Sequence, residues 1–453
     1  MRRRRQVAAL TAAIVVAATL AVAGTQAAPD RELNLETFDA AWRIINETHW
    51  DPEFNGVDWE SVRDELRPRA GEAGSAAQLR AVIIDMIGRL GQSHFAVWPR
   101  GALGSLRPDD GGGGAGLGGR REAGAARGGD PGFATVLVDD RFVVARVDEQ
   151  GPGAAAGVRP GWVVHSINGV ELDTAALVAV EGVERHKVLV EAQRGMDRRL
   201  SRRPGETLEL LFLDGDDQPV ELEVRVQRPA GELRTFGNMP PVFARLESRL
   251  LEPDVDIIVG VIAFNIWLPQ LAPAFDGAID TMRDAQGIIL DLRGNPGGVG
   301  GMVMGFGGHF VEEYVSLGTM RTRDGELRFV ANPRRINTSG ELVDPFAGPL
   351  AILIDNTSAS TSEVFAGGLQ AIGRARVFGQ RSMGAVLPSL MDELPNGDIL
   401  QHAFADFVVT ASGERLEGRG VVPDQEIDIT RADLLAGRDP ALEAAVEWIV
   451  GQH

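Results

Sequence analysis

The clearest chemical signal in this chain is a run of small hydroxyl residues between an apolar, strand-like segment and a helical one. The apolar segment ends at Ile354, and Ser358, Ser360 and Ser362 precede a helical stretch that begins near Val364. A serine at such a turn lies near the positive end of the helix, and neighbouring N–H groups face any oxygen that gains charge beside it. Ser360 is therefore a candidate nucleophile for acyl transfer. The competing interpretation is a helix cap, which is the commoner role of a serine at this position.

Two further segments combine glycine turns with polar groups. Residues 289–298 read ILDLRGNPGG, so an apolar strand runs into a turn whose exposed N–H groups could hold an oxyanion. The same turn could equally cradle a phosphate or simply connect two elements. Residues 414–424 read ERLEGRGVVPD and place Glu417 in a glycine-rich turn. A solvated glutamate is the usual interpretation of such a residue.

His94 is the strongest candidate for a general base among the 7 histidines. It follows Ser93 directly after a predicted helix over residues 75–90 that ends at Gly91. Because the ordinary pKa of histidine lies near neutrality, we expect activity to depend on a group that titrates there. His309 is a distant second, since it lies in a glycine-rich helical stretch and could approach the core. The histidines with weaker contexts are His49, His165, His186, His402 and His453.

The elements that must position these groups begin with helices. Apolar residues recur at helical spacing over residues 35–66. We therefore predict an N-terminal helical domain over residues 29–105, which ends with Ser93 and His94. Residues 106–132 are rich in Gly, Arg and Ala, and they predict a mobile linker or a long loop.

The next part of the chain has the texture of short strands. Residues 151–162 read GPGAAAGVRPGW, and Ile167-Asn168-Gly169 follow. The small residues allow a short helix to pack tightly, and the Asn-Gly pair closes a hairpin. This pattern resembles a PDZ domain of the bacterial protease type, which we place over residues 114–229. Strands are expected at residues 135–138 and 141–147 and near 207–213 and 220–226, with an inserted helix between 175 and 203.

Residues 235–430 alternate apolar strand-like runs with helices, which is an α/β pattern. A small-residue turn follows each run, and the runs are expected at residues 257–264, 287–292 and 350–355. Residues 431–453 form the tail and close with an amphipathic helix near residues 439–450.

The glycine turn over residues 291–298, the serine turn that ends in Glu363 and the Glu417 segment together resemble the tail-specific and tricorn-like serine peptidase family. The resemblance covers nearly the whole chain after the first thirty or so residues. It implies a ClpP/crotonase-like α/β core with an N-terminal helical domain and an inserted PDZ-like β domain. It also implies Ser360 as the nucleophile.

The same resemblance implies which backbone groups stabilise the oxyanion. The donors carry over as the N–H groups of Thr361 and Gly298, with Gly297 as the near alternative to Gly298.

One branch of this family uses a Ser–Lys dyad, and the chain departs from it. The position of that lysine holds Ala385, and Lys187, the only lysine of the chain, lies in the PDZ-like part. Arginine cannot replace lysine as a base, because its pKa stays far above neutrality. The tricorn-type branch instead pairs Ser-His with a glutamate. The resemblance to that branch implies His94 as general base, with Ser93 and Glu417 orienting and stabilising the imidazole.

The composition excludes several other functions. The formal charge of −19 comes from 45 basic and 64 acidic residues, so phosphates of nucleic acids and anionic membranes would repel the chain. The chain has no cysteine, which removes disulfides, thiol nucleophiles and thiolate metal sites. No two histidines have helical ligand spacing beside a carboxylate, and the sequence therefore predicts neither a metal site nor a cofactor.

The first residues predict export. Four arginines at positions 2–5 precede an apolar run over residues 7–22 and then small residues before Pro29. This is the pattern of a secretory signal peptide, which we place over residues 1–28, so that the protein is periplasmic or secreted. The alternative is an uncleaved membrane anchor, although the run is shorter than the roughly 20 residues that a spanning helix needs. No later stretch is apolar enough to span a membrane.

The sequence thus predicts a serine peptidase that cleaves extracytoplasmic peptides or the C-terminal tails of proteins. The PDZ-like domain would hold the substrate as an added strand by its terminal carboxylate, and it would swing freely on the preceding linker. The alternative is a non-catalytic binding protein on the same fold, which takes peptides or apolar ligands. The joint presence of Ser360, Ser93, His94 and Glu417 favours catalysis.

Overall fold

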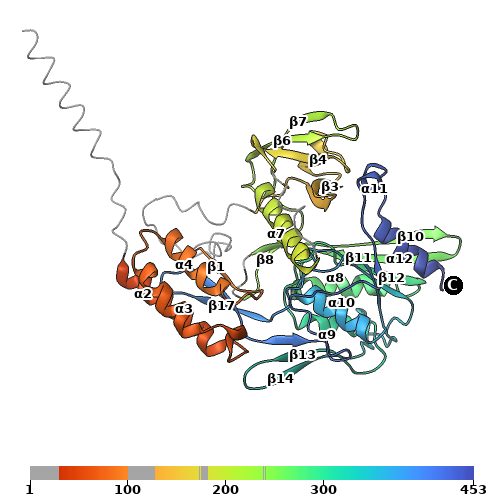
Figure 1. Ribbon diagram of the computed structural model, residues 1–453. Coiled ribbons are helices and arrows are strands. Elements are labelled where there is room, and N and C mark those ends of the chain that lie inside the picture. The colour runs from red at the N-terminus through yellow and green to blue at the C-terminus, as the bar shows by residue number, and fades with distance from the viewer. Residues whose placement is uncertain (1–29, 100–127, 173, 175–181, 238, 240) are drawn as a thin grey trace, which may run out of the picture.

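The computed structural model describes residues 30–99, 128–172, 174, 182–237, 239 and 241–453, with side chains from residue 188 onward in the segment that begins at 182. The predicted signal peptide, most of the linker over residues 106–132 and the side chain of Lys187 lie outside this description. The chain forms a helical domain, a β domain (residues 128–229) and an α/β core (Figure 1). Within the described ranges, no helix is long and apolar enough to cross a membrane.

The helical domain contains two helices where the sequence predicted one over residues 35–66. The elements are α2 (Arg31–Thr48), the 3₁₀ turn η1 (Phe54–Gly56), α3 (Trp59–Gly71) and α4 (Ala76–Gly88). The single-helix prediction was wrong because the chain turns at Asn55, which has a left-handed φ of 57°, and because Asp58 caps a new helix by accepting from Ser61 N–H. The expected second helix is present as α4, with Ser75 as its N-cap.

The helical domain docks on the core through a shared sheet. The segment after α4 forms β1 (Ala96–Trp98), which pairs antiparallel with the core strand β18 (Ile399–Ala403), and β17 (Ser389–Glu393) completes the sheet. Leu394 and Leu400 from the core are buried among the apolar faces of the three helices. Residues 89–95, between α4 and β1, are therefore held from both sides.

The β domain is an antiparallel sheet with the order β2-β3-β4-β6-β7. Its elements are β2 (Phe133–Val138), β3 (Arg141–Val147), α5 (Pro152–Ala156), β4 (Val163–Ile167), β5 (Val170–Glu171), α7 (Gly182–Leu200), β6 (Thr207–Leu213) and β7 (Pro219–Arg225). The expected strands and the expected inserted helix, α7, are confirmed. Phe133, Phe212 and Met196 are buried in the core of this domain.

The core is built on one mostly parallel sheet, and the predicted α/β pattern is confirmed. The sheet contains β10 (Leu246–Asp254), β11 (Ile257–Phe264), β12 (Gly287–Asp291), β15 (Leu350–Ile354), β16 (Arg376–Gly379) and β20 (Gln425–Glu426), in that order. All neighbours except the β10–β11 hairpin are parallel. The remaining elements are β8 (Glu232–Arg234), β9 (Val242–Ala244), η2 (Pro269–Leu271), α8 (Ala272–Thr281), α9 (Met302–Gly307), β13 (Val315–Arg321), β14 (Glu326–Ala331), α10 (Thr361–Ala371), β19 (Asp406–Val408), α11 (Arg431–Leu435) and α12 (Pro440–Val450).

Apolar residues cover both faces of this sheet. Leu290 and Ile352 belong to the larger cluster, together with residues of α8, α9 and α10. Ile289 and Leu353 point to the other face, where Ile449 of α12 packs. Because β12 and β15 are adjacent and parallel, the turns that follow them meet at the same edge of the sheet. These two turns contain the glycine segment and Ser360.

A short helix of the tail fastens the β domain to the core. Arg431 of α11 donates to Gly161 O at 2.9 Å and pairs with Asp217 at 2.7 Å. Leu434 is buried against β3 and β4, at Val143 and Val163. In Figure 1, α11 lies beside the β domain, well away from the helical domain. The tail thus forms a second connection to the β domain, which the linker pattern did not reveal, and the expected freedom to swing stays a prediction.

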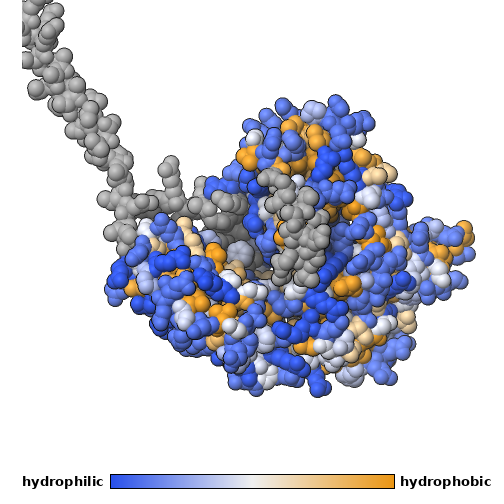
Figure 2. Space-filling model, viewed as in Figure 1, coloured by the Kyte–Doolittle hydropathy of each residue, from blue (hydrophilic) through white to orange (hydrophobic). Residues whose placement is uncertain are grey.

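The side of the molecule drawn in the space-filling view is mostly hydrophilic. Figure 2 shows hydrophilic residues over most of the visible face, with hydrophobic residues scattered among them.

We predict that Leu434→Ala loosens the contact between α11 and the β domain. Removing a buried leucine side chain costs roughly 2–5 kcal/mol, and we expect faster amide hydrogen exchange in α11 and around Gly161, with unchanged exchange in β12 and β15. Leu327→Ala, at an exposed position in β14, is the matched control. Exchange in α11 that does not differ between the wild type and Leu434→Ala would contradict this description.

Candidate active site

Ser360 occupies a strained turn between β15 and α10. Its backbone has φ 54° and ψ −117°, an arrangement that costs a non-glycine residue about 1–3 kcal/mol. The N–H of Ser360 holds the turn by donating to Ala385 O at 2.8 Å and to Glu363 Oε2 at 2.9 Å. The residue remains partly exposed. A serine held in this way presents its hydroxyl at the carboxyl edge of the sheet.

The glycine turn after β12 packs directly against Ser360. A Cβ added to Gly297 would lie 2.6 Å from Ser360 Cβ and 2.9 Å from Thr361 N, and one added to Gly298 would lie 2.3 Å from Trp267 O. The φ angles of Gly297 and Gly298, 98° and 143°, are also unfavourable for other residues. Both positions therefore require glycine.

The hydrogen bonds of this turn distinguish the two glycines. Gly297 N–H donates to the buried Asn295 Oδ1 at 2.9 Å, and Asn295 O accepts from Ala359 N–H at 3.0 Å. Among the described residues, the N–H groups of Gly298 and Thr361 have no acceptor. The sequence left Gly297 as the near alternative, and the structure directs its N–H away from the site. Gly298 and Thr361 are thus the pair available to an oxyanion beside Ser360.

The structure brings together Ser93, His94 and Glu417, as the sequence predicted. Ser93 Oγ lies 2.8 Å from His94 Nδ1 and donates to Glu417 Oε2 at 2.9 Å. Glu417 also accepts from Ser93 N–H at 2.8 Å and from Val386 N–H at 3.1 Å. Val386 follows Ala385, whose carbonyl accepts from Ser360 N–H. The segments that carry the histidine and the serine are therefore attached to the same stretch of chain.

This arrangement determines the state of the His94 ring. An ionised carboxylate only accepts hydrogen bonds, so the Ser93 hydroxyl must be the donor in its hydrogen bond with Glu417. Ser93 Oγ can then only accept from His94, which requires the ring proton on Nδ1. His94 Nε2 is left with its lone pair, as a general base requires.

The electrostatic surroundings of Ser93, His94 and Glu417 favour the neutral form of His94. Burial and, to a smaller extent, the positive charge of Arg194 lower the pKa of His94 to about 4. This direction differs from the sequence-based expectation of titration near neutrality. Burial also raises the pKa of Glu417, while the N–H groups of Ser93 and Val386 act in the opposite direction.

Glu363 is an important residue that the functional interpretation of the sequence missed. It is fully buried, and its carboxylate accepts from Ser360 N–H, Ser382 Oγ, Gly384 N–H and Ala385 N–H at 2.6–3.0 Å. Burial raises the pKa of Glu363 to about 7 in spite of these four donors. Its pairing with Ser360 N–H is that of a capping box, and a glutamate three residues after a capping serine is the signal that could have found it.

Ala385 stands where one branch of the family has a lysine, and it contributes main-chain hydrogen bonds instead of a basic side chain. Ala385 is buried, and its main chain bonds both Ser360 and Glu363. Among the residues with described side chains there is no lysine.

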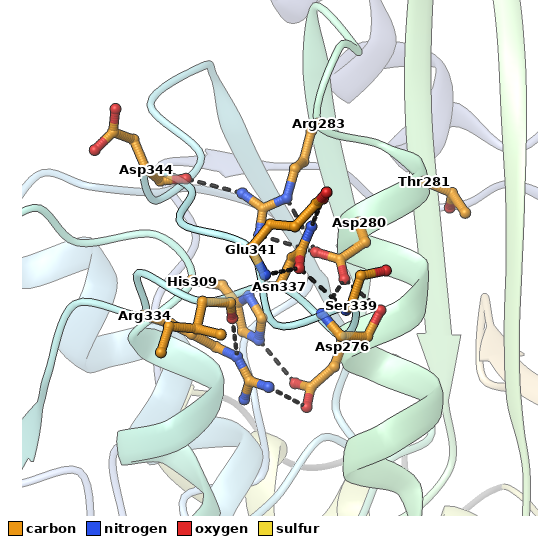
Figure 3. Close-up of polar contacts among 12 residues, drawn as sticks. Asp276, Asp280, Thr281, Arg283, His309, Arg334, Asn337, Ser339, Glu341 and Asp344 are labelled. Carbon is orange, nitrogen blue, oxygen red and sulfur yellow. Dashed lines mark hydrogen bonds and ion pairs between the residues drawn. The ribbon is translucent and has the colours of Figure 1, made fainter.

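The buried histidines His49, His309 and His402 have structural partners. His309 Nε2 lies 2.8 Å from Asp276 of α8, which also pairs with Arg334 at 2.7 Å (Figure 3). His309 O accepts from Phe346 N–H. These contacts fasten residues 332–346 to α8. His309, the second candidate, is therefore engaged by Asp276.

Two more histidines anchor the helical domain. His49 Nε2 lies 2.9 Å from Oε1 of Gln92. Gln92 precedes His94 by two residues in the sequence. His402 Nδ1 bonds Thr48 at 3.0 Å and its Nε2 bonds Asp392 at 2.7 Å. In the part of the chain that the structure describes, no group of three or more His, Asp or Glu side chains could hold a metal ion.

These features define a candidate site around Ser360 at the edge of an α/β core, and comparisons with known proteins relate this core to one family. Residues 258–427 match peptidase family S41, and residues 31–88 match the tricorn protease C1 domain. Residues 258–427 therefore belong to peptidase family S41, a family of serine-type peptidases.

Two curated relatives agree with this assignment, and one solved structure shares the fold. Tricorn protease homolog 1 of Streptomyces coelicolor is 26% identical over 91% of this chain and 34% of its own length. A probable CtpA-like serine protease of Staphylococcus aureus is 24% identical over 64% of this chain and 51% of its own length. The photosystem II D1 C-terminal processing protease shares the fold, with a TM-score of 0.55 and 19% identity over 87% of this chain and 93% of that chain. The chain thus spans between 34% and 51% of the length of these two curated relatives.

We predict that His94 titrates far below ordinary histidines. A folded pKa of about 4 lies below the ordinary 6.5, so the unfolded chain binds more protons between these values. The contribution of His94 to stability is complete above pH 6.5 and is lost as the pH falls toward 4. NMR titration of labelled histidine, assigned with His94→Gln, should give an apparent pKa near 4. A value near neutrality would contradict the burial described above.

We also predict that Glu363→Gln destabilises the protein by about 1–3 kcal/mol, because the amide NH₂ must face some of the four donors and leave them unpaired. Thermal unfolding measures the change, and Glu313→Gln, at an exposed position, is the control. Equal melting temperatures for the two variants would show that the four hydrogen bonds to Glu363 are not needed.

Proposed function

We propose that this protein is a serine peptidase that hydrolyses peptide bonds in peptides or in the C-terminal tails of proteins through an acyl-enzyme on Ser360, with His94 as the base. One observation carries the proposal. Ser93 Oγ bridges Glu417 and His94 Nδ1, at 2.9 and 2.8 Å, and so leaves His94 Nε2 unprotonated. A histidine that only packed in the core would not require this bridge.

In the first half of the reaction, Ser360 Oγ attacks the scissile carbonyl carbon while His94 Nε2 takes the hydroxyl proton. The carbonyl oxygen becomes an oxyanion, which the N–H groups of Gly298 and Thr361 bind. The imidazolium then gives its proton to the amide nitrogen, and the amine product leaves. The acyl group remains on Ser360.

In the second half, water takes the place of the amine. His94 Nε2 accepts a proton from the water, whose oxygen attacks the acyl carbon at the same oxyanion site. The proton passes from His94 to Ser360 Oγ as the acyl bond breaks. Glu417, through Ser93, stabilises the imidazolium that forms in each half.

We further infer that the β domain is PDZ-like and handles the peptide substrate, and that the protein acts in the periplasm or is secreted. The glycine- and alanine-rich segment at α5 and the order of strands and helix support the first inference. The arginines at positions 2–5 and the apolar run that follows them support the second. Cell fractionation of the native protein, with sizing of its N-terminus by mass spectrometry, tests the location.

We predict that a fluorophosphonate labels the protein at Ser360 and that peptide mapping finds the adduct there. His94→Ala should lower kcat/KM for a peptide by several orders of magnitude, because it removes the base. Lys187→Ala should leave the rate nearly unchanged.

Ser360→Ala is the control for labelling, since it removes only a partly exposed hydroxyl and should stay folded. Near-normal turnover by folded Ser360→Ala would contradict the proposal. A folded wild-type protein that neither reacts with the probe nor cleaves peptides would favour the non-catalytic binding protein.

A further inference from the structure

Helix α7 extends from the β domain toward the core (Figure 1). Its inner face is fixed in the β domain, where Gln193, Met196 and Leu200 are only 2–4% exposed. Residues spaced by three and four positions share one face of a helix, so Arg194 lies to the side of this face. The anchored face determines where Arg194 projects.

A hydrogen bond to the edge strand β2 adds to this anchoring. The N–H and C=O of Val144 form hydrogen bonds with Trp162 and Gly161, on the side of β3 away from β2. Thr135 lies opposite Val144 in β2, so the backbone N–H and C=O of Thr135 point to the free edge of β2. Gln193 Nε2 donates to Thr135 O at 3.0 Å at this edge. This hydrogen bond fixes the position of α7 along β2.

Arg194 reaches from α7 to the nucleophile turn. Its NH2 group lies 2.9 Å from Met383 Sδ. Met383 N–H donates to Ser358 O at 3.0 Å, and Ala385, two residues further on, bonds Ser360. The Arg194 charge also acts on the His94 ring and lowers its pKa. The β domain thus places one guanidinium next to the segments that carry both the nucleophile and the base.

This guanidinium is available to a ligand. The Arg194 side chain is 44% exposed, and its ion-pair partner is Glu191, at 2.9 Å and 62% exposed. An exposed pair one helical turn apart contributes little to stability, so a better-placed carboxylate can replace Glu191. The planar guanidinium is suited to bidentate pairing with a carboxylate.

The position of the charge also has a catalytic consequence. A cation beside His94 disfavours the imidazolium that forms during catalysis, and a carboxylate that pairs with Arg194 would offset this effect. A substrate with a suitably placed carboxylate would therefore gain both binding and rate. A neutral substrate would gain neither.

We propose that Arg194 is a specificity-determining residue that pairs with a carboxylate of the substrate close to the scissile bond. The inference rests on the proposed peptidase activity and deepens it. The carboxylate is either the terminal carboxylate of the peptide or the side chain of an Asp or Glu residue. The two sources have the same chemistry and differ in which substrates they favour.

The test compares matched peptides on the intact protein. One pair differs by a free or an amidated C-terminus, and a second, amidated pair differs by Glu or Gln beside the cleaved bond. Wild-type kcat/KM should favour the carboxylate member of at least one pair by about tenfold to hundredfold, the range expected of a hydrogen bond to a charged group. The pair that shows the preference identifies the source.

The variants assign the preference to Arg194. Arg194→Gln should reduce the ratio of kcat/KM values to near one, Arg194→Lys should retain part of it, and added salt should lower it in the wild type. Arg199→Gln, at an exposed position on another side of α7, should keep the wild-type ratio. An active Arg194→Gln with the wild-type ratio, or a wild type without preference in either pair, would overturn the inference. If no peptide is cleaved and Ser360 is not labelled, the proposed function fails, and this inference fails with it.

Discussion

The hydrogen bond between Ser93 Oγ and Glu417 Oε2 is the link on which the proposed catalytic arrangement depends. Glu417 is largely removed from water, so its carboxylate needs donors, and two of its three come from Ser93. The helical domain therefore completes a site that the core cannot complete alone. The pairing of β1 with β18 and the packing of Leu394 and Leu400 among the helices hold the domain in place. With this link formed, the tautomer of His94 follows from the acceptor-only chemistry of the carboxylate.

The opposite side of the site depends on buried polar groups that stabilise a strained backbone. Ser360 keeps its unfavourable φ and ψ because its N–H is bonded to Ala385 and Glu363 and because Asn295 ties the glycine turn to Ala359. These interactions together exceed the roughly 1–3 kcal/mol that the strain costs. The free N–H groups of Gly298 and Thr361 are consequently arranged before a substrate arrives, which is the condition for electrostatic stabilisation of an oxyanion.

The sequence predicted that Ser93, His94 and Glu417 lie together, and the structure contains these contacts, but their surroundings were predicted less well. Ser360, Ser93, His94 and Glu417 were identifiable because each lies in a short segment whose pattern depends only on neighbours in the chain. Glu363 was missed because a capping glutamate is usually exposed, and only the fold shows that it is buried under four donors. The low pKa of His94 could not be predicted, since burial and the charge of Arg194 come from elements distant in sequence. The break at Asn55 and the contact of α11 with the β domain also depend on packing that local patterns do not encode.

Ser93 connects Glu417 to His94, and in the proposed mechanism the three side chains act as one unit. A double-mutant cycle on kcat/KM with Ser93→Ala, Glu417→Gln and the double variant measures this coupling most directly. If Glu417 acts only through Ser93, the double variant should be no slower than the slower single variant, so that the losses are strongly non-additive. Losses that multiply, in folded proteins, would mean that Glu417 and Ser93 act independently and would contradict the account.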